Sequence, residues 1–150
     1  MIREAAVQDA EVLENLLAQL GYPDTAVFLK ERIQTLLNHP DASLAVYETD
    51  GRVVALLCLH VIPQIALLGS FLRISYFVVD ETMRSAHIGS ALEAYALEIA
   101  REKGCDRIEV HCHERRTDAH RFYARCGYVE SPKYFVKNLH VRSENAERIS

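Results

Sequence analysis

The sequence predicts an α/β (α+β) fold in which one mixed β-sheet is flanked by helices. Segments of strand character and segments of helical period follow one another in the order βααββ and then βαβαβ. The apolar segment VVALLCLHV shows no alternation, which is typical of a central strand covered on both faces. The 150 residues are 49% hydrophobic and 25% charged, which is the composition of a single globular domain.

The N-terminal part is predicted to hold one strand and two helices. The strand covers residues 2–5. Asp9 can cap the first helix, which Gly21 and Pro23 end. The same apolar period predicts a second helix over residues 25–38. The apolar face of the first helix is formed by Val12, Leu13, Leu16, Leu17 and Leu20.

A β-hairpin is predicted next, with strands at residues 43–48 and 53–61. The Asp50-Gly51 pair between them can take the positive φ angles that a tight hairpin turn needs. Another strand covers residues 71–79. Helical periodicity then returns over residues 88–103.

The remaining elements complete the predicted order. We expect a strand at residues 107–112, a helix at 118–126 and a last strand at 134–139. One domain then covers residues 1–140, and residues 141–150 form a polar tail.

Charge and composition exclude several classes of partner. Seventeen Lys and Arg against 21 Asp and Glu give a net charge of −4, so nonspecific nucleic-acid binding is not expected. The acidic N-terminal segment does not resemble a signal peptide, and no apolar run reaches the about 18 residues of a membrane span. We therefore expect a cytoplasmic protein with reduced cysteines and no membrane partner.

A metal site is not expected either. Cysteine and histidine gather in one part of the chain, but their spacing fits no zinc pattern. Cys112 points opposite to its histidine neighbours on the predicted strand. The residues considered are Cys105, His111, Cys112, His113 and His120.

An anion-binding turn is predicted where the strand at 71–79 leads into the helix at 88–103. Unpaired amides and partial positive charge at a helix N-terminus attract anions. Small residues keep the backbone open there: Ser85, Ala86, Gly89 and Ser90. A plain crossover loop is the alternative interpretation of this segment alone.

Two motifs together resemble the GNAT superfamily of acetyl-coenzyme A-dependent N-acetyltransferases. The turn is similar to the family's Q/R-x-x-G-x-G/A pattern at Arg84 and Gly89, and departs from it at His87. We expect His87 to take ordinary helical geometry. A later family pattern is matched at Ala119, Phe122, Tyr123, Gly127 and Tyr128, with Thr117 standing where Asn is usual. The resemblance covers about residues 1–139, and its finer features are similar to the branch that holds aminoalkylphosphonate and aminoglycoside acetyltransferases.

The resemblance implies an acyltransferase that moves an acetyl group from acetyl-coenzyme A directly to a primary amine. It implies a small-molecule acceptor and a homodimer. Backbone groups of Phe77, Val78 and Val79 are expected to pair with the pantetheine arm. The other residues implied to bind the coenzyme are Arg84, Ser85, Ala86, His87, Ile88, Gly89, Ser90, Thr117, Ala119, Phe122 and Tyr123.

Tyr123 is the implied general acid, because a hydroxyl of high pKa can protonate the departing thiolate. An aromatic side chain of the core is the alternative. Many family members take their general base from a carboxylate on the strand before the turn, where this chain has Ser75 and Tyr76. Strand alternation instead places Glu109 and His111 on one face, together with His113, and makes these two residues the candidate bases. A solvent-facing or purely structural role is the alternative for them.

The acceptor pocket is expected to be built by the first two helices and their loop. Tyr22, Asp24, Phe28 and Tyr76 are the candidate substrate-binding residues, with Glu31 beside Asp24 for an ammonium group and Arg32 for an acidic group.

Three other functions stay open on the sequence. One is a noncatalytic module that binds an acyl-coenzyme A as a sensor, which the absent strand carboxylate and His87 favour. Another is acetylation of a protein amine. The third is transfer of a longer acyl group, which the volume near Ile74 and Cys112 decides.

Overall fold

The computed structural model describes residues 1–84, 86–112, 116–131 and 134–140. The chain divides into two compact units, Met1–Val110 and His111–Ser150. The first contains the sheet and most of the helices. That residues 1–140 form one domain stays a prediction.

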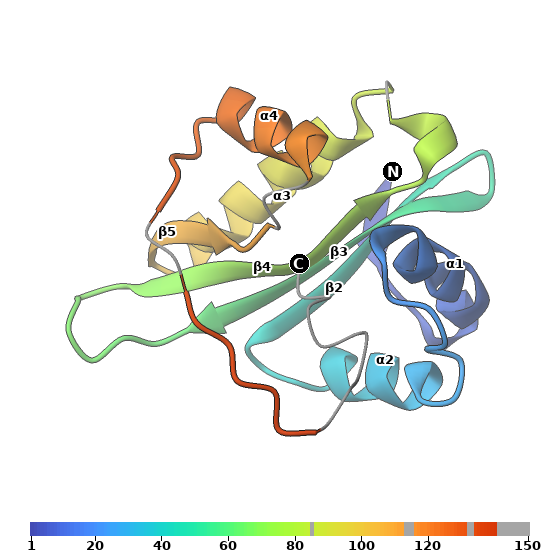
Figure 1. Ribbon diagram of the computed structural model, residues 1–150, viewed down its shortest axis with the longest axis horizontal. Coiled ribbons are helices and arrows are strands. Elements are labelled where there is room, and N and C mark those ends of the chain that lie inside the picture. The colour runs from blue at the N-terminus through green and yellow to red at the C-terminus, as the bar shows by residue number, and fades with distance from the viewer. Residues whose placement is uncertain (85, 113–115, 132–133, 141–150) are drawn as a thin grey trace. The chain divides into compact units, whose positions relative to one another are not determined.

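Five strands form one sheet in the first unit. Across the sheet they follow their order in the chain, and only the pair β4–β5 is parallel (Figure 1). The predicted mixed sheet flanked by helices is therefore confirmed. The strands are β1 (Ile2–Glu4), β2 (Ala42–Thr49), β3 (Arg52–Ile62), β4 (Ser70–Val79) and β5 (Cys105–Val110).

β3 is the middle strand, which explains its unbroken apolar run. All residues from 53 to 59 are buried, because helices cover both faces of the sheet here. The hairpin that joins β2 to β3 turns at Asp50 (φ 53°) and Gly51 (φ 72°). Both residues take the left-handed conformation that the Asp-Gly pair predicts.

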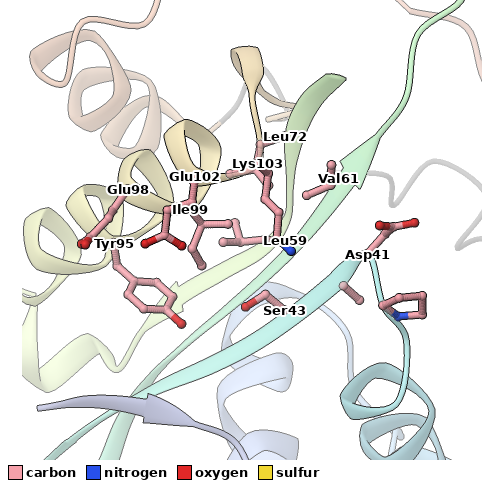
Figure 2. Close-up of a pocket in the computed structure, with 12 residues that line it drawn as sticks. Asp41, Ser43, Leu59, Val61, Leu72, Tyr95, Glu98, Ile99, Glu102 and Lys103 are labelled. Carbon is pink, nitrogen blue, oxygen red and sulfur yellow. The ribbon is translucent and has the colours of Figure 1, made fainter. Parts of the chain in front are cut away.

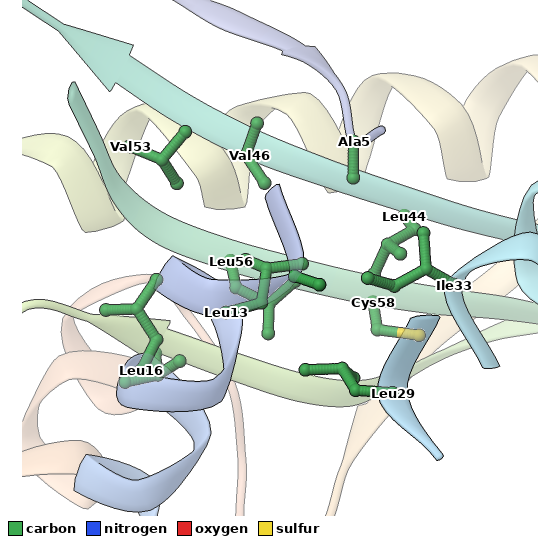
Figure 3. Packing of buried hydrophobic residues seen from close by; sticks show 12 residues of the cluster. Ala5, Leu13, Leu16, Leu29, Ile33, Leu44, Val46, Val53, Leu56 and Cys58 are labelled. Carbon is green, nitrogen blue, oxygen red and sulfur yellow. The ribbon is translucent and has the colours of Figure 1, made fainter. Parts of the chain in front are cut away.

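Helices lie on both faces of this sheet. α1 (Ala10–Leu20) and α2 (Leu29–Leu37) cover one face, and α3 (Ile88–Glu102) covers the other (Figure 1). Figure 3 shows Leu13 and Leu16 of α1 packed towards Leu56 of β3. Two short 3-10 turns precede α1 and α3: η1 (Val7–Asp9) and η2 (Glu81–Met83). None of the helices described has the length and apolar content needed to cross a membrane.

Asp9 does not cap α1 as predicted. Its Oδ2 accepts a 2.8 Å hydrogen bond from the Ala6 amide, and its carboxylate accepts two hydrogen bonds from the Arg3 guanidinium, at 2.9 and 3.0 Å. The hydrogen bond from Arg3 is the main reason why the pKa of Asp9 is lowered from 3.8. The Asp9 carboxylate therefore binds the Arg3 guanidinium and the Ala6 amide, and forms no capping hydrogen bond to the start of α1.

α2 begins at Leu29, four residues later than the start predicted at residue 25. Asp24 takes a left-handed φ of 64°, and the Thr25 carbonyl oxygen accepts hydrogen bonds from the amides of both Phe28 and Leu29. This turn occupies the segment in which the predicted first helical turn would lie.

The second unit differs most from the sequence prediction. β5 ends at Val110, so His111 and Cys112 follow the strand instead of belonging to it. Residues 134–139 form no strand, and Phe135 and Leu139 are 96% and 87% exposed. Strand character in a short segment is a weak signal by itself, because a strand forms only where another strand pairs with it. The predicted tail at 141–150 lies outside the described residues.

Candidate functional site

β4 has different partners along its length. Its parallel ladder with β5 ends at Ile74, opposite Val110, whereas its antiparallel ladder with β3 continues to Val79. Residues 77–79, predicted to pair with the pantetheine arm, therefore lie beyond the end of the β4–β5 ladder. Because Val78 is buried in the core, only its backbone can contact a coenzyme.

The turn after β4 is fixed by its own hydrogen bonds. Asp80 Oδ1 accepts bonds from the Thr82 amide (2.9 Å) and hydroxyl (2.7 Å), and the Asp80 amide donates to the Val54 carbonyl oxygen (2.8 Å). The bond from the Thr82 amide is the main cause of the lowered pKa of Asp80. The side chain of Arg84 follows, exposed, with Nε 3.4 Å from the Val79 carbonyl oxygen. Its guanidinium is therefore accessible to solvent next to this turn.

His87 does not take helical geometry, and this prediction is wrong. Its φ of 62° and ψ of 17° are left-handed, at the position that immediately precedes α3. The chain passes here from η2 into the helix, at the position where the family pattern usually has glycine. A left-handed conformation costs a residue with a Cβ atom about 1–2 kcal/mol.

The N-terminus of α3 can hold an anion. The first intrahelical bond closes at Ala91, whose amide donates to the His87 carbonyl oxygen. The amides that precede it have no acceptor within the helix, and the helix dipole adds a partial positive charge of about 0.5. Ala86, His87 and Ser90 are exposed around it, as a phosphate site needs. Of the predicted residues Ile88, Gly89 and Ser90 supply these amides, and Ser85 lies outside the described residues.

The later motif forms α4 (Thr117–Arg125) in the second unit. The ring centroid of Tyr123 lies 5.3 Å from that of Phe122 and 5.3 Å from that of Tyr128. Gly127, with a φ of 92°, lets the chain turn back so that the Tyr128 amide donates to the Tyr123 carbonyl oxygen. The predicted residues Thr117 and Ala119 lie in the first turn of this helix.

A cavity of about 210 Å³ opens between α1, α2 and the sheet. Four residues predicted from the sequence line it: Tyr22, Phe28, Arg32 and Tyr76. The Tyr22 and Tyr76 rings meet edge to face, and the Arg32 guanidinium carbon lies 5.1 Å from the centre of the Phe28 ring. We call this space the acceptor cavity.

Asp24 and Glu31 do not line the acceptor cavity, contrary to prediction. Asp24 forms the left-handed bend before α2, and Glu31 is exposed on that helix. The α2 residues that line the cavity recur at helical spacing, which turns Glu31 away from it. Among the described lining residues, Arg32 is therefore the only one with a permanent charge.

Burial keeps two other groups of the acceptor cavity, the Tyr76 phenol and the Cys58 thiol, neutral near neutral pH, because it raises the pKa of each. Burial, helped by Tyr22 and Cys58 and opposed by Arg32, raises the pKa of Tyr76. Burial raises the pKa of the Cys58 thiol to about 12. The cavity thus presents one cation in an apolar and aromatic lining, which suits a molecule with an acidic group.

Glu109 is held by two arginines. Its Oε2 accepts a 2.9 Å bond from Arg107 Nε, and its Oε1 accepts a 3.3 Å bond from Arg73 Nη2. Burial acts to raise the pKa of Glu109, but these hydrogen bonds outweigh it and the net pKa is lowered. A carboxylate in this state is a weak proton acceptor.

His111 does not share a strand face with Glu109. It follows the end of β5, and its ring stacks on Tyr134 with a centroid distance of 4.1 Å. His113 lies outside the described residues. The predicted alternation fails because the strand ends before it reaches either histidine.

Two polar side chains on the side of the sheet that α1 and α2 cover, His60 and Thr25, were not predicted from the sequence, whereas Ser75 was named only as standing in the place of a carboxylate. His60 Nδ1 and Ser75 Oγ are joined by a 2.7 Å hydrogen bond between β3 and β4. The hydroxyl of Thr25, which lines the acceptor cavity, is buried without a hydrogen-bond partner in the described part of the chain. His60 stands inside an apolar segment and Thr25 inside a predicted helix, so no local pattern marked them.

A second, larger cavity of about 380 Å³ lies between α3 and the sheet (Figure 2). Glu98, Glu102 and Lys103 of α3 line it, together with apolar residues of β3 and β4. It contains none of the residues that the sequence predicts for the site. The candidate residues predicted from the sequence therefore line only the smaller of these two cavities.

The described residues contain no group of three or more His, Cys, Asp or Glu that could hold a metal ion. All four cysteines lie in the described part of the chain, and each is a free thiol. Cys58 is the buried one.

Comparisons with known proteins show similarity in both sequence and fold. The chain is 32% identical over 140 residues to an aminoalkylphosphonate N-acetyltransferase of Salmonella typhimurium, covering 92% of this chain and 90% of that relative. Its fold is similar to that of a transcriptional regulator from Bacillus halodurans C-125, with a TM-score of 0.84, 24% identity and coverage of 93% and 99% of the two chains. It is also similar to glucosamine-6-phosphate N-acetyltransferase from Arabidopsis thaliana, with a TM-score of 0.81, 20% identity and coverage of 93% and 98%.

A family assignment follows from the extent of the match. Residues 9–128 match the Acetyltransferase (GNAT) family, a range that includes the turn, the acceptor cavity and the later motif. The chain therefore belongs to the GNAT acetyltransferase family and is an acyltransferase.

Proposed function

We propose that this acyltransferase moves an acetyl group from acetyl-coenzyme A to the primary amine of a small molecule that also carries an acidic group. One observation carries the proposal: β4 joins the two halves of the site. Tyr76 lines the acceptor cavity, and residues 77–79 directly after it lead into the anion-binding turn. The acceptor and the thioester can therefore meet at neighbouring positions of one strand.

The coenzyme half uses the backbone. Residues 77–79 pair with the pantetheine arm, as the resemblance implies. The amides of Ile88, Gly89 and Ser90 hold the pyrophosphate, and Arg84 adds a positive charge to phosphates that are always ionised. The resemblance to the GNAT family implies that four residues of α4 also bind the coenzyme: Thr117, Ala119, Phe122 and Tyr123.

The acceptor half selects a small, acidic amine. A cavity of about 210 Å³ is smaller than most ligand pockets, and Arg32 is positioned to pair with a phosphonate or carboxylate. The name of the Salmonella relative, an aminoalkylphosphonate N-acetyltransferase, supports the same class. A protein amine is the competing acceptor.

Tyr123 is the proposed general acid. After the amine attacks the thioester carbonyl carbon and the carbon–sulfur bond breaks, the phenol donates its proton to the coenzyme A thiolate. The attacking nitrogen gives up its extra proton as the amide forms, and the phenolate takes up a proton in exchange. This role needs a hydroxyl of high pKa within hydrogen-bond reach of the sulfur, and the resemblance implies that Tyr123 supplies it. We also propose that the protein is cytoplasmic and that it forms a homodimer. Light scattering of the purified protein tests the homodimer.

The experiment is thiol release from acetyl-coenzyme A with a panel of amines, run beside Tyr123→Phe. Aminomethylphosphonate and glycine represent acidic amines, propylamine a neutral amine, and a lysine-containing peptide the protein acceptor. We expect release with the acidic amines, reduced about 100-fold or more in Tyr123→Phe with little change in KM. Release with the peptide alone contradicts the proposal. Longer acyl-coenzyme A donors, tested in parallel, should react more slowly than acetyl-coenzyme A.

A further inference from the structure

The site lacks an obvious general base. An alkylammonium group has a pKa near about 10 and must lose a proton before its nitrogen can attack. Glu109 is paired with two arginines, and β4 offers only Ser75 and Tyr76 where a carboxylate is expected. Some other group on the acceptor side of the sheet has to accept this proton.

A β-bulge in β4 separates Ser75 from the regular ladder. Cys58 of β3 pairs with Tyr76, and the next residue, Leu59, pairs with Ile74, so Ser75 is the extra residue between them. Bulges re-aim side chains and are common next to active sites. The Ser75 hydroxyl finds its partner in the imidazole of His60, with Oγ 2.7 Å from Nδ1.

The pair lies beside the acceptor cavity. Ser75 directly precedes Tyr76, and both Tyr76 and Cys58 line the cavity. His60 stands two residues after Cys58 on the same strand, so alternation places the two side chains on one face of β3. The Ser75 hydroxyl is thus one residue from the cavity lining on β4, and the His60 imidazole is two residues from it on β3.

The groups around His60 keep its imidazole neutral. Burial lowers its pKa from 6.5, and the positive charge that His39 and Arg73 can carry lowers it further. His39 follows α2, with its ring centroid 6.3 Å from that of His60, and Arg73 is the cross-strand partner of His60 on β4. Glu109 faces this cluster from β5, where it is paired with Arg73 at 3.3 Å. A neutral imidazole at neutral pH can accept a proton.

We propose that Ser75 and His60 form the proton relay that deprotonates the acceptor amine, an inference that rests on the proposed function. The ammonium group gives a proton to Ser75 Oγ while the Ser75 hydroxyl proton moves to His60 Nδ1. The neutral amine then attacks the thioester. The imidazolium afterwards releases its proton to solvent. In this relay Ser75 contacts the substrate, and His60 acts through it.

The test measures kcat/KM for acetylation of aminomethylphosphonate against pH in the unaltered protein, His60→Gln and Ser75→Ala. Removing a general base typically costs about 100- to 10,000-fold near neutral pH. If the relay operates, the enzyme can use the protonated amine, so kcat/KM of the unaltered protein should not change with pH above the pKa of His60. Without it only free amine reacts, so the variants should gain about tenfold per pH unit and approach the unaltered rate near about pH 10.

His39→Gln is the matched control, because it removes a neighbouring imidazole that does not reach Ser75. We expect His39→Gln to keep the flat profile. Because His39 lowers the pKa of His60, the pH below which kcat/KM falls should rise slightly in this variant. Thermal melting and calorimetric titration with coenzyme A check that the His60 and Ser75 variants fold and still bind the coenzyme.

Two outcomes overturn the relay and can be told apart. If the unaltered protein acetylates aminomethylphosphonate and His60→Gln keeps its flat profile with less than about threefold loss, the relay is wrong and the proposed function stands. If the unaltered protein turns over no amine of the panel, the proposed function fails and the relay fails with it.

Discussion

The ring of Tyr22 meets the ring of Tyr76 edge to face, with their centroids 5.5 Å apart. Tyr22 belongs to the loop after α1, and Tyr76 to the strand that leads into the anion-binding turn. Edge-to-face aromatic pairs of this kind contribute about 0.5–1.5 kcal/mol beyond the area that they bury. The contact therefore links the wall of the acceptor cavity to the strand on which the coenzyme is proposed to lie.

Replacing Arg32 should weaken binding of acidic amines only. A hydrogen bond to a charged group contributes about 1.5–3 kcal/mol, so Arg32→Gln should raise KM for aminomethylphosphonate about 10- to 100-fold. KM for propylamine should hardly change. Lys30→Gln, an exposed position of α2 that does not line the cavity, is the control. Equal losses for both amines in Arg32→Gln would assign Arg32 a structural role.

Replacing His87 with glycine should stabilise the protein. Glycine takes the left-handed φ of 62° without the Cβ clash that costs histidine about 1–2 kcal/mol, although part of this gain is lost to the flexibility of glycine when unfolded. We expect the free energy of unfolding to rise by up to about 1 kcal/mol in urea titrations.

Ser90→Gly is the matched control for this substitution. Ser90 lies inside α3, where glycine destabilises a helix by about 0.5–1 kcal/mol relative to alanine. Its unfolding midpoint should therefore fall while that of His87→Gly rises. A fall in both variants would show that His87 gains compensating contacts in its left-handed conformation.

The Arg3–Asp9 pair should make stability depend on acid pH. The folded-state pKa of Asp9 is lowered below 3.8, so the stabilisation is fully present above that pH and is lost as pH falls through the folded value. Asp9→Asn should lower the free energy of unfolding by about 1–3 kcal/mol at neutral pH.

Unfolding in urea at neutral pH and again near about pH 3 measures this effect, and the difference between the unaltered protein and Asp9→Asn should shrink in acid. Glu48→Gln, which removes the other carboxylate bound to Arg3, should cost less than about 1 kcal/mol, because Glu48 is more exposed. A loss in Asp9→Asn that does not change with pH would mean that the ion pair is not its origin.

Cys58 should be unreactive in the folded protein. Its side chain is 2% exposed, and burial raises the pKa of its thiol to about 12, so the reactive thiolate is scarce. In a thiol titration near about pH 8, Cys58→Ala should lower the number of groups that react in urea without changing the fast reaction of the native protein. A smaller fast reaction in the native variant would show that Cys58 is accessible through the cavity.

Much of the fold follows from local patterns. The unbroken apolar run of β3, the Asp-Gly turn before it and the helical period of α3 each correspond to an element of the structure. These patterns act over a few residues, through side-chain periodicity and φ preferences, and so can be read without knowing what lies nearby. Four residues that line the cavity between α1, α2 and the sheet were predicted in a different way, from the resemblance to the GNAT family.

What depends on distant partners could not be predicted. Asp9 binds Arg3 instead of capping α1, β5 ends where its ladder with β4 ends, and residues 134–139 form no strand. The pairing of His60 with Ser75 joins residues 15 apart in the chain through one bulge in a strand register. Residue types and local periods are properties of the sequence, whereas which polar groups meet, and therefore which protons can move, is decided only when the strands take their register.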